Sequence, residues 1–168
     1  MRSTTAIWLI AVCCSCGSAE QDTVLDLVFD PCEPLVVEAG GANAEQRAAI
    51  DDALDLWRPL GVIGPTRETK ADAPHVEVRF EEAADAFHGL YDDEHAVIYI
   101  NSRMTLRSDL AITMAHELGH ALGLWHVADR PSVMNPGNLV VTPNAGDQAA
   151  LEQLWGGCTP PATPDRAY

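Results

Sequence analysis

The feature that most constrains this chain is an eleven-residue segment, HELGHALGLWH, at positions 116–126. His116 and His120 are four residues apart, so on a helix their rings project from the same face. Two imidazoles one helical turn apart can chelate a single zinc ion. The segment therefore predicts a helix that carries a metal site.

Two further residues of the segment indicate which kind of metal site it is. Gly123 can adopt a left-handed conformation and turn the chain out of the helix, which lets His126 return as a third ligand. Glu117 places a carboxylate beside the metal rather than on it. Three protein ligands leave one position open for water, as in catalytic zinc sites. The alternative is a helix that carries exposed histidines by accident.

The segment resembles the zinc motif of the metzincin metallopeptidases. Met134 follows His126 by eight residues, within SVMNP, and matches the methionine turn that metzincins have under the metal. Spacing and sequence are most similar to the matrixin branch, the family of matrix metalloproteinases and their short bacterial relatives. The chain departs from matrixins at Trp125, Val127 and Asn135, where Asp, Ser and Tyr are usual. These departures affect the expected substrate preference more than zinc binding.

The resemblance covers most of residues 24–157 and implies an α+β fold. This fold is a twisted, mostly parallel sheet with an antiparallel edge strand, an active-site helix and a C-terminal helix. The residue patterns themselves predict strands at 23–29, 75–80 and 96–100, and helices at 44–58, 109–122 and 147–155. Asn43 with Gln46 is expected to cap the first helix, and Ser108 the second. If the 96–100 strand is the edge strand, an extended peptide could pair with it.

The function implied by the resemblance is that of a zinc-dependent endopeptidase, a hydrolase of peptide bonds in proteins or peptides. The ligands of one catalytic Zn²⁺ would be His116, His120 and His126. Glu117 would be the general base for the metal-activated water, and Met134 would shape the floor of the site. Asp147, in the last helix, would support the methionine turn. The alternative on the same fold is a catalytically silent zinc-binding surface lipoprotein or interaction module.

Additional metals are a weaker expectation. Many matrixins hold a second, structural zinc and calcium in the region where His88 and His95 flank several acidic residues. The spacing here is shorter than their metal loop, so we expect a polar hairpin turn with exposed histidines. Calcium or a second structural zinc remains an open but unsupported alternative. His75 opens a strand and is expected to be an ordinary surface side chain.

The N-terminal residues 1–19 predict an export signal, with Arg2 before a short apolar run and then small residues. Cysteines at 13, 14 and 16 leave two alternatives open, a lipoprotein with an N-terminal lipid anchor and a freely exported protein. A frayed tail of a cytosolic protein is the third. The expected organisation is a signal peptide at 1–19, a matrixin-like catalytic domain at 20–158 and a flexible polar tail at 159–168.

Removal of the signal would leave two cysteines, Cys32 and Cys158, and an even pair in an exported domain suggests a disulfide. Two free thiols are the alternative. The net charge is −15, from 25 acidic and 10 basic side chains, which argues against nucleic acid as a partner. We expect a monomer that is extracellular, periplasmic or anchored by lipid at the cell envelope.

Overall fold

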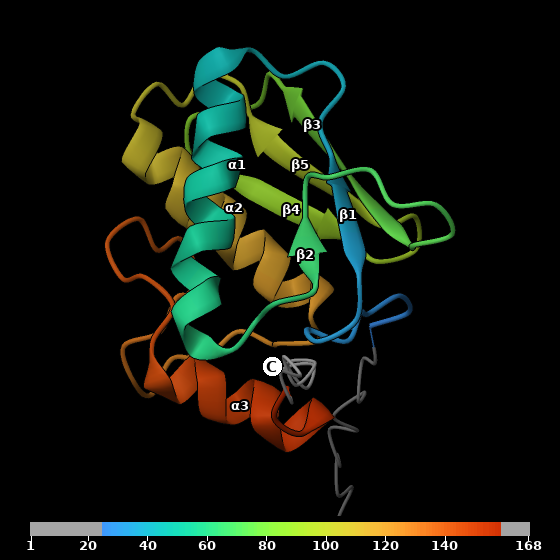
Figure 1. Ribbon diagram of the computed structural model, residues 1–168. Helices are drawn as coiled ribbons and strands as arrows, with labels where there is room; N and C mark the ends of the chain where they lie inside the picture. Colours follow the sequence, from blue (N-terminus) through green and yellow to red (C-terminus); the bar gives the residue numbers. More distant parts are fainter. Residues whose placement is uncertain (1–24, 159–168) are drawn as a thin grey trace, which may run out of the picture.

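The computed structural model describes residues 25–158, and the sheet that they form has five strands. The strands are β1 (Leu35–Glu38), β2 (Pro65–Thr66), β3 (His75–Glu81), β4 (Gly89–Asp92) and β5 (Val97–Asn101). Their order is β2-β1-β3-β5-β4, and every pair is parallel except β4 with β5 (Figure 1). The predicted fold class, a mostly parallel sheet with an antiparallel edge strand, is confirmed.

The helices are α1 (Ala44–Trp57), the short 3₁₀ helix η1 (Arg58–Leu60), α2 (Arg107–Ala121) and α3 (Ala145–Trp155). Of these, α1 and α2 cover one face of the sheet (Figure 1). In β3, Val76 and Val78 are buried while the alternate residues Glu77 and Arg79 face outward, as expected for a half-buried strand. The buried side chains join α1 and α2 in one core, and α3 closes the lower end of the molecule (Figure 1).

The tryptophan of α1 ties the first two helices together. Trp57 is fully buried, and its indole Nε1 donates a hydrogen bond to the Ala115 carbonyl of α2, at 3.0 Å. Because a buried indole N–H needs a partner, this bond fixes the place of α1 against the middle of α2. The core therefore sets the position of the helix that carries the histidine motif.

The prediction of a strand at residues 23–29 is wrong for residues 25–29, the part of this segment that the structure describes. Residues 25–29 instead bend at Asp26 and Leu27, and their backbone amides donate to two different parts of the chain. The Leu27 amide donates to the Asp93 carbonyl at 3.1 Å, and the Phe29 amide donates to the Ala121 carbonyl at 2.8 Å. Single bonds to separate partners do not make a ladder, although the residues are good strand formers.

The expectation that the 96–100 strand could be the sheet edge is also wrong. That strand is β5, which lies between β3 and β4, so the edge strand on this side of the sheet is β4 and the opposite edge is β2. β4 and β5 form the hairpin that was expected around His88 and His95. Short strands such as β1, β2 and β4 lack the length on which alternation patterns depend.

The helix starts differ in how well the sequence predicts them. Asn43 and Gln46 form the expected capping box, with reciprocal bonds of 2.9 and 2.8 Å. Ser108 is not the cap of α2, because this helix begins at Arg107 with Leu106 in the N-cap position. α3 begins two residues before the predicted start, because Asn144 caps it with a second capping box.

A disulfide joins Cys32 to Cys158, with an S–S distance of 2.03 Å, which confirms the expected pair. It links the chain before β1 to the residues that follow α3. The expected signal peptide at 1–19 and tail at 159–168 lie outside the described residues. Within residues 25–158, no helix has the length and apolar character needed to span a membrane.

Candidate metal centre

Three histidine rings converge at the end of α2. His116 and His120 lie on the last turns of this helix, and His126 lies in the loop that follows it. The Nε2 atom of His126 is 3.1 Å from Nε2 of His116 and 3.3 Å from Nε2 of His120. The structure thus brings together the three side chains that the sequence singles out as zinc ligands.

Backbone carbonyls set the orientation of two of these rings. Nδ1 of His116 lies 2.7 Å from the Val133 carbonyl, and Nδ1 of His120 lies 2.8 Å from the Leu124 carbonyl. A carbonyl oxygen only accepts hydrogen bonds, so in each ring Nδ1 carries the proton and Nε2 keeps its lone pair. Metal-binding histidines are commonly oriented in this way by a bond from the other ring nitrogen.

The donor set fits a zinc ion. Zn–N bonds in a tetrahedral site place neighbouring nitrogens about 3.3 Å apart, close to the two measured Nε2 distances. Burial lowers the pKa of His116, and burial, with a contribution from His116, lowers the pKa of His120 to about 4. Both rings are therefore neutral at neutral pH. Their Nε2 lone pairs face one another, an arrangement that a bound cation would stabilise.

Gly123 provides the turn that brings the third histidine back. Its φ is +93°, in the left-handed region, and its amide donates to the His120 carbonyl at 2.8 Å. This conformation is strained for any residue with a Cβ atom. The role that the sequence suggests for Gly123, ending the helix so that the chain returns to His126, agrees with this geometry.

Met134 lies fully buried beneath the histidine helix. A Cβ atom on Gly119 would approach the Met134 sulfur to 2.5 Å, so any other residue at this position of α2 would force the methionine to shift. The Met134 carbonyl accepts a hydrogen bond from the Val127 amide, at 3.1 Å. The methionine turn is thus tied to the residue that follows His126.

Asp147 of α3 holds the methionine turn from the other side. Its side chain is 0% exposed and accepts hydrogen bonds from the Ser132 hydroxyl and from the Val133 amide, the latter at 3.2 Å. Arg130 donates to the same carboxylate at 3.1 Å. Because the Val133 carbonyl orients His116, this carboxylate acts on a metal-site ring through the backbone, in the supporting position that the sequence suggests.

Glu117 is buried next to the histidines and faces the edge strand. Burial raises the pKa of its carboxyl to about 8, and a hydrogen bond from the Tyr91 backbone opposes this shift. A Cβ atom on Gly89 would lie 2.9 Å from Oε1 of Glu117, so the strand and the carboxylate are in close contact. Sequence reasoning missed Gly89, whose only signal is a lone glycine in a short strand.

An open cleft of about 340 Å³ runs over the histidines and Glu117. One wall is the edge strand β4 with the residues before it, and another is the chain just after the methionine turn. Trp125, 48% exposed, also lines the cleft. An extended chain that enters the cleft would meet an unpaired strand edge, the surface used in strand addition.

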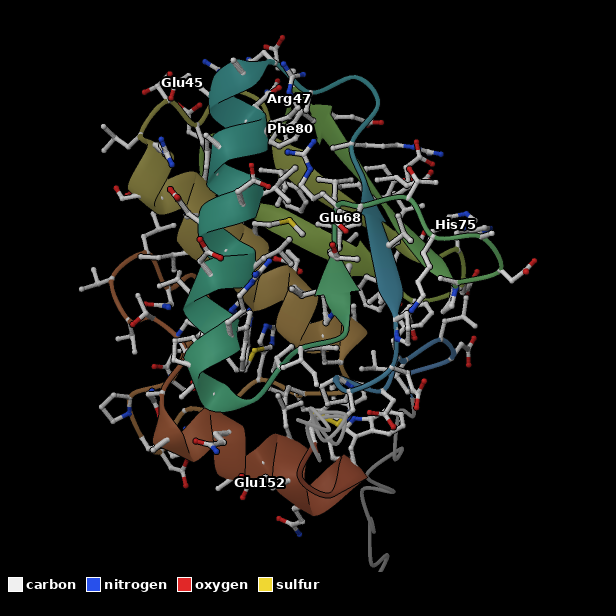
Figure 2. The ribbon with its side chains drawn as sticks, in the orientation of Figure 1. Glu45, Arg47, Glu68, His75, Phe80 and Glu152 are labelled. Atoms are coloured by element: carbon white, nitrogen blue, oxygen red, sulfur yellow. A yellow bond between two sulfur atoms is a disulfide. The ribbon has the colours of Figure 1, made fainter. Side chains whose placement is uncertain are left out.

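The remaining histidines lie outside the triad. Within residues 25–158, the triad is the one group of His, Cys, Asp or Glu side chains placed closely enough to share an ion. His95 pairs with Asp92 at the hairpin, with Nδ1 3.1 Å from each carboxylate oxygen. His75 stands exposed at the start of β3, far from α2 (Figure 2). His88 lines the cleft wall.

A histidine helix, a glycine turn, a third histidine and a buried methionine turn, on a sheet with one antiparallel edge strand, define the metzincin class. Within this class, residues 85–156 match the family model Peptidase_M10, the matrixins. The crystal structure of myroilysin has a similar fold, with a TM-score of 0.52 and 14% sequence identity over 77% of this chain and 86% of that one. No curated protein sequence matches the chain. The chain is thus similar to the matrixins over residues 85–156 and has a metzincin-like fold, in agreement with the sequence motif.

Proposed function

We propose that this protein is a zinc-dependent endopeptidase that uses Glu117 as its general base. The observation that carries this proposal is the meeting of three imidazoles and one buried carboxylate in an open cleft. The match to the matrixin family supports a metallopeptidase. A site that only stored zinc would have no need of a buried carboxylate beside the ligands.

The proposed ligands of one Zn²⁺ are His116, His120 and His126. When bound, zinc polarises the scissile carbonyl and lowers the pKa of a water molecule toward neutrality. Glu117 accepts the proton of that water at its carboxylate and then delivers it to the nitrogen of the departing amine. A nearby cation favours the ionised form of Glu117, which offsets the effect of burial on its pKa.

The substrate in this proposal is a protein or peptide bound in extended form. The exposed edge of β4 offers backbone groups for pairing, and the cleft is open enough to admit a chain. The disulfide is compatible with an exported protein, either free or anchored by lipid. We extend the proposal to a monomeric catalytic domain at residues 20–158, with the signal before it and the polar tail after it.

The test compares wild type with Glu117→Ala and Glu117→Gln. We expect about one zinc per chain in all three, and a loss of peptidase activity on a mixed peptide library by about 10²-fold or more in both variants. Glu152→Ala is the matched control, because Glu152 is exposed on α3, away from the cleft (Figure 2). This variant should keep wild-type activity.

Two outcomes would contradict the proposal in different ways. Wild-type activity in Glu117→Gln would remove Glu117 as the base while leaving a zinc peptidase. A folded, zinc-loaded wild type without activity would instead favour the alternative, a zinc-binding surface lipoprotein or interaction module on the same fold.

A further inference from the structure

The loop at residues 82–88 must pass over the end of a strand. It connects β3 to β4, but β5 lies between these two strands in the sheet. Since β3 and β5 are parallel, with Glu81 opposite Asn101, the loop arches over the carboxyl end of β5. An arch of this kind turns backbone carbonyls inward, where they need hydrogen-bond donors.

Asn101, the last residue of β5, occupies the space under this arch. It is 2% exposed, and its Nδ2 donates to the carbonyls of Phe87 at 2.8 Å and Ala84 at 3.1 Å. Its Oδ1 accepts from the amides of Ala83 at 3.2 Å and Arg103 at 3.1 Å. One buried side chain therefore satisfies backbone groups at both ends of the loop.

The other face of the same loop belongs to the catalytic cleft. Ala86, Phe87 and His88 line the cleft, and the loop leads directly into the edge strand at Gly89. The backbone amide of Asn101 also donates to the His88 carbonyl at 2.8 Å, which extends the β4–β5 pairing to that residue. Asn101 does not line the cleft itself, so any effect on a substrate passes through the loop.

We propose that Asn101 is a positioning residue for peptide binding: its buried amide holds the 82–88 loop, and thereby the wall of the cleft next to β4, without the help of a metal ion. This inference rests on the proposed peptidase function only for its kinetic consequence, a higher KM for peptide substrates in Asn101 variants. The structural consequence, an ordered loop that depends on the side-chain N–H groups of Asn101, stands independently.

The sharpest variant is Asn101→Asp, which keeps the shape and the acceptor oxygen but replaces the amide donor by a second oxygen. That oxygen would face the carbonyls of Ala84 and Phe87. Asn101→Ser, smaller and uncharged, is the second variant in case the carboxylate prevents folding. Two controls separate the loss of the Asn101 amide from a general loss of stability and from the loss of exposed ion pairs to the loop. Asn43→Ala removes a capping asparagine of α1 whose hydrogen bonds go to Gln46 and not to the loop, and Arg103→Ala removes only exposed ion pairs to the loop.

The first measurement is amide hydrogen exchange, which needs no peptidase activity. In Asn101→Asp and Asn101→Ser, exchange at residues 83–88 should rise by about tenfold or more, with zinc content unchanged and both controls close to wild type. Wild-type exchange in a folded Asn101→Asp or Asn101→Ser protein would overturn the proposal. So would protection of wild-type residues 83–88 that is lost on calcium chelation and restored by calcium, because an ion would then hold the loop.

The second measurement is kinetic. For a peptide long enough to reach the loop, KM should rise by about threefold or more in the Asn101 variants, while kcat stays within about twofold of wild type. A fall of about threefold or more in kcat, with KM unchanged, would contradict a positioning role in binding. A wild type without any activity would defeat the proposed function, whereas the exchange result would still decide whether Asn101 holds the loop.

Discussion

At the scale of single residues, Gly89 sets how closely β4 approaches the candidate base. Any Cβ atom there would lie 2.9 Å from both Oε1 of Glu117 and Cγ2 of Thr113. Glycine in a strand ordinarily costs stability relative to alanine, by about 0.5–1 kcal/mol, so its presence here points to a close approach. We expect Gly89→Ala to displace the Glu117 carboxylate and to lower kcat/KM by about tenfold or more, with zinc content unchanged.

The matched control is Gly40→Ala, because a Cβ atom on this exposed glycine meets nothing within 4 Å. Steady-state kinetics on one peptide substrate, with metal analysis of each protein, makes the comparison. If Gly89→Ala retained wild-type kcat/KM, the close contact between the strand and Glu117 would not matter for catalysis.

At the scale of elements, α3 contacts the methionine turn beneath the candidate metal centre although it provides none of the three histidines. Its first turn carries Asp147, which is buried and accepts bonds from Arg130 and the methionine turn. Asp147→Asn leaves Arg130 without its partner charge and turns an amide toward backbone N–H groups. We expect a loss of about 3 kcal/mol in the free energy of unfolding, as for a broken buried pair. Zinc affinity should fall by about 10-fold or more, because the Val133 carbonyl that orients His116 would shift.

Urea unfolding and competition with a zinc chelator measure these two effects. Glu45→Gln is the control, because Glu45 is the acidic residue in the first turn of α1 but is exposed, so its loss should cost only about 0.3–1 kcal/mol. Unchanged zinc affinity in a destabilised Asp147→Asn would mean that α3 supports the fold but does not act on the metal centre.

At the scale of the whole molecule, the disulfide constrains almost the entire described chain. Cys32 and Cys158 are 126 residues apart, and closing a loop of this length lowers the entropy of the unfolded state. The chain-entropy account gives a contribution of about 5 kcal/mol to the free energy of unfolding. We expect the double variant Cys32→Ser/Cys158→Ser to unfold at a clearly lower urea concentration and still bind about one zinc per chain without urea.

We expect zinc to be retained because neither cysteine is among the residues that line the cleft over the histidines. Wild type unfolded with and without a reductant is the natural comparison, since the reduced protein should behave like the double variant. Equal midpoints for the oxidised and reduced proteins would show that the bridge adds no stability.

Local patterns were enough to predict what depends on neighbours in the chain. The helical spacing of His116 and His120, the capping box at Asn43 and the alternation in β3 each involve residues within one or two turns of one another. The pairing of the two remaining cysteines needed only their number and the expected export. These features predicted individual helices and strands and two of the candidate ligands, whereas the fold class came from the resemblance to the metzincins.

What only the tertiary structure decided is the arrangement around that centre. The order of strands does not follow their order in the chain, so no local pattern marks β4 rather than β5 as the edge. Gly89 and Asn101 matter because of atoms that approach from other parts of the chain, and their own neighbours in sequence give no sign of it. The sequence alone determined which side chains form the candidate centre, because helical spacing directs His116 and His120 to one face and a glycine turn brings His126 back. The cleft that would present a peptide to them depends on long-range packing, which only the folded chain defines.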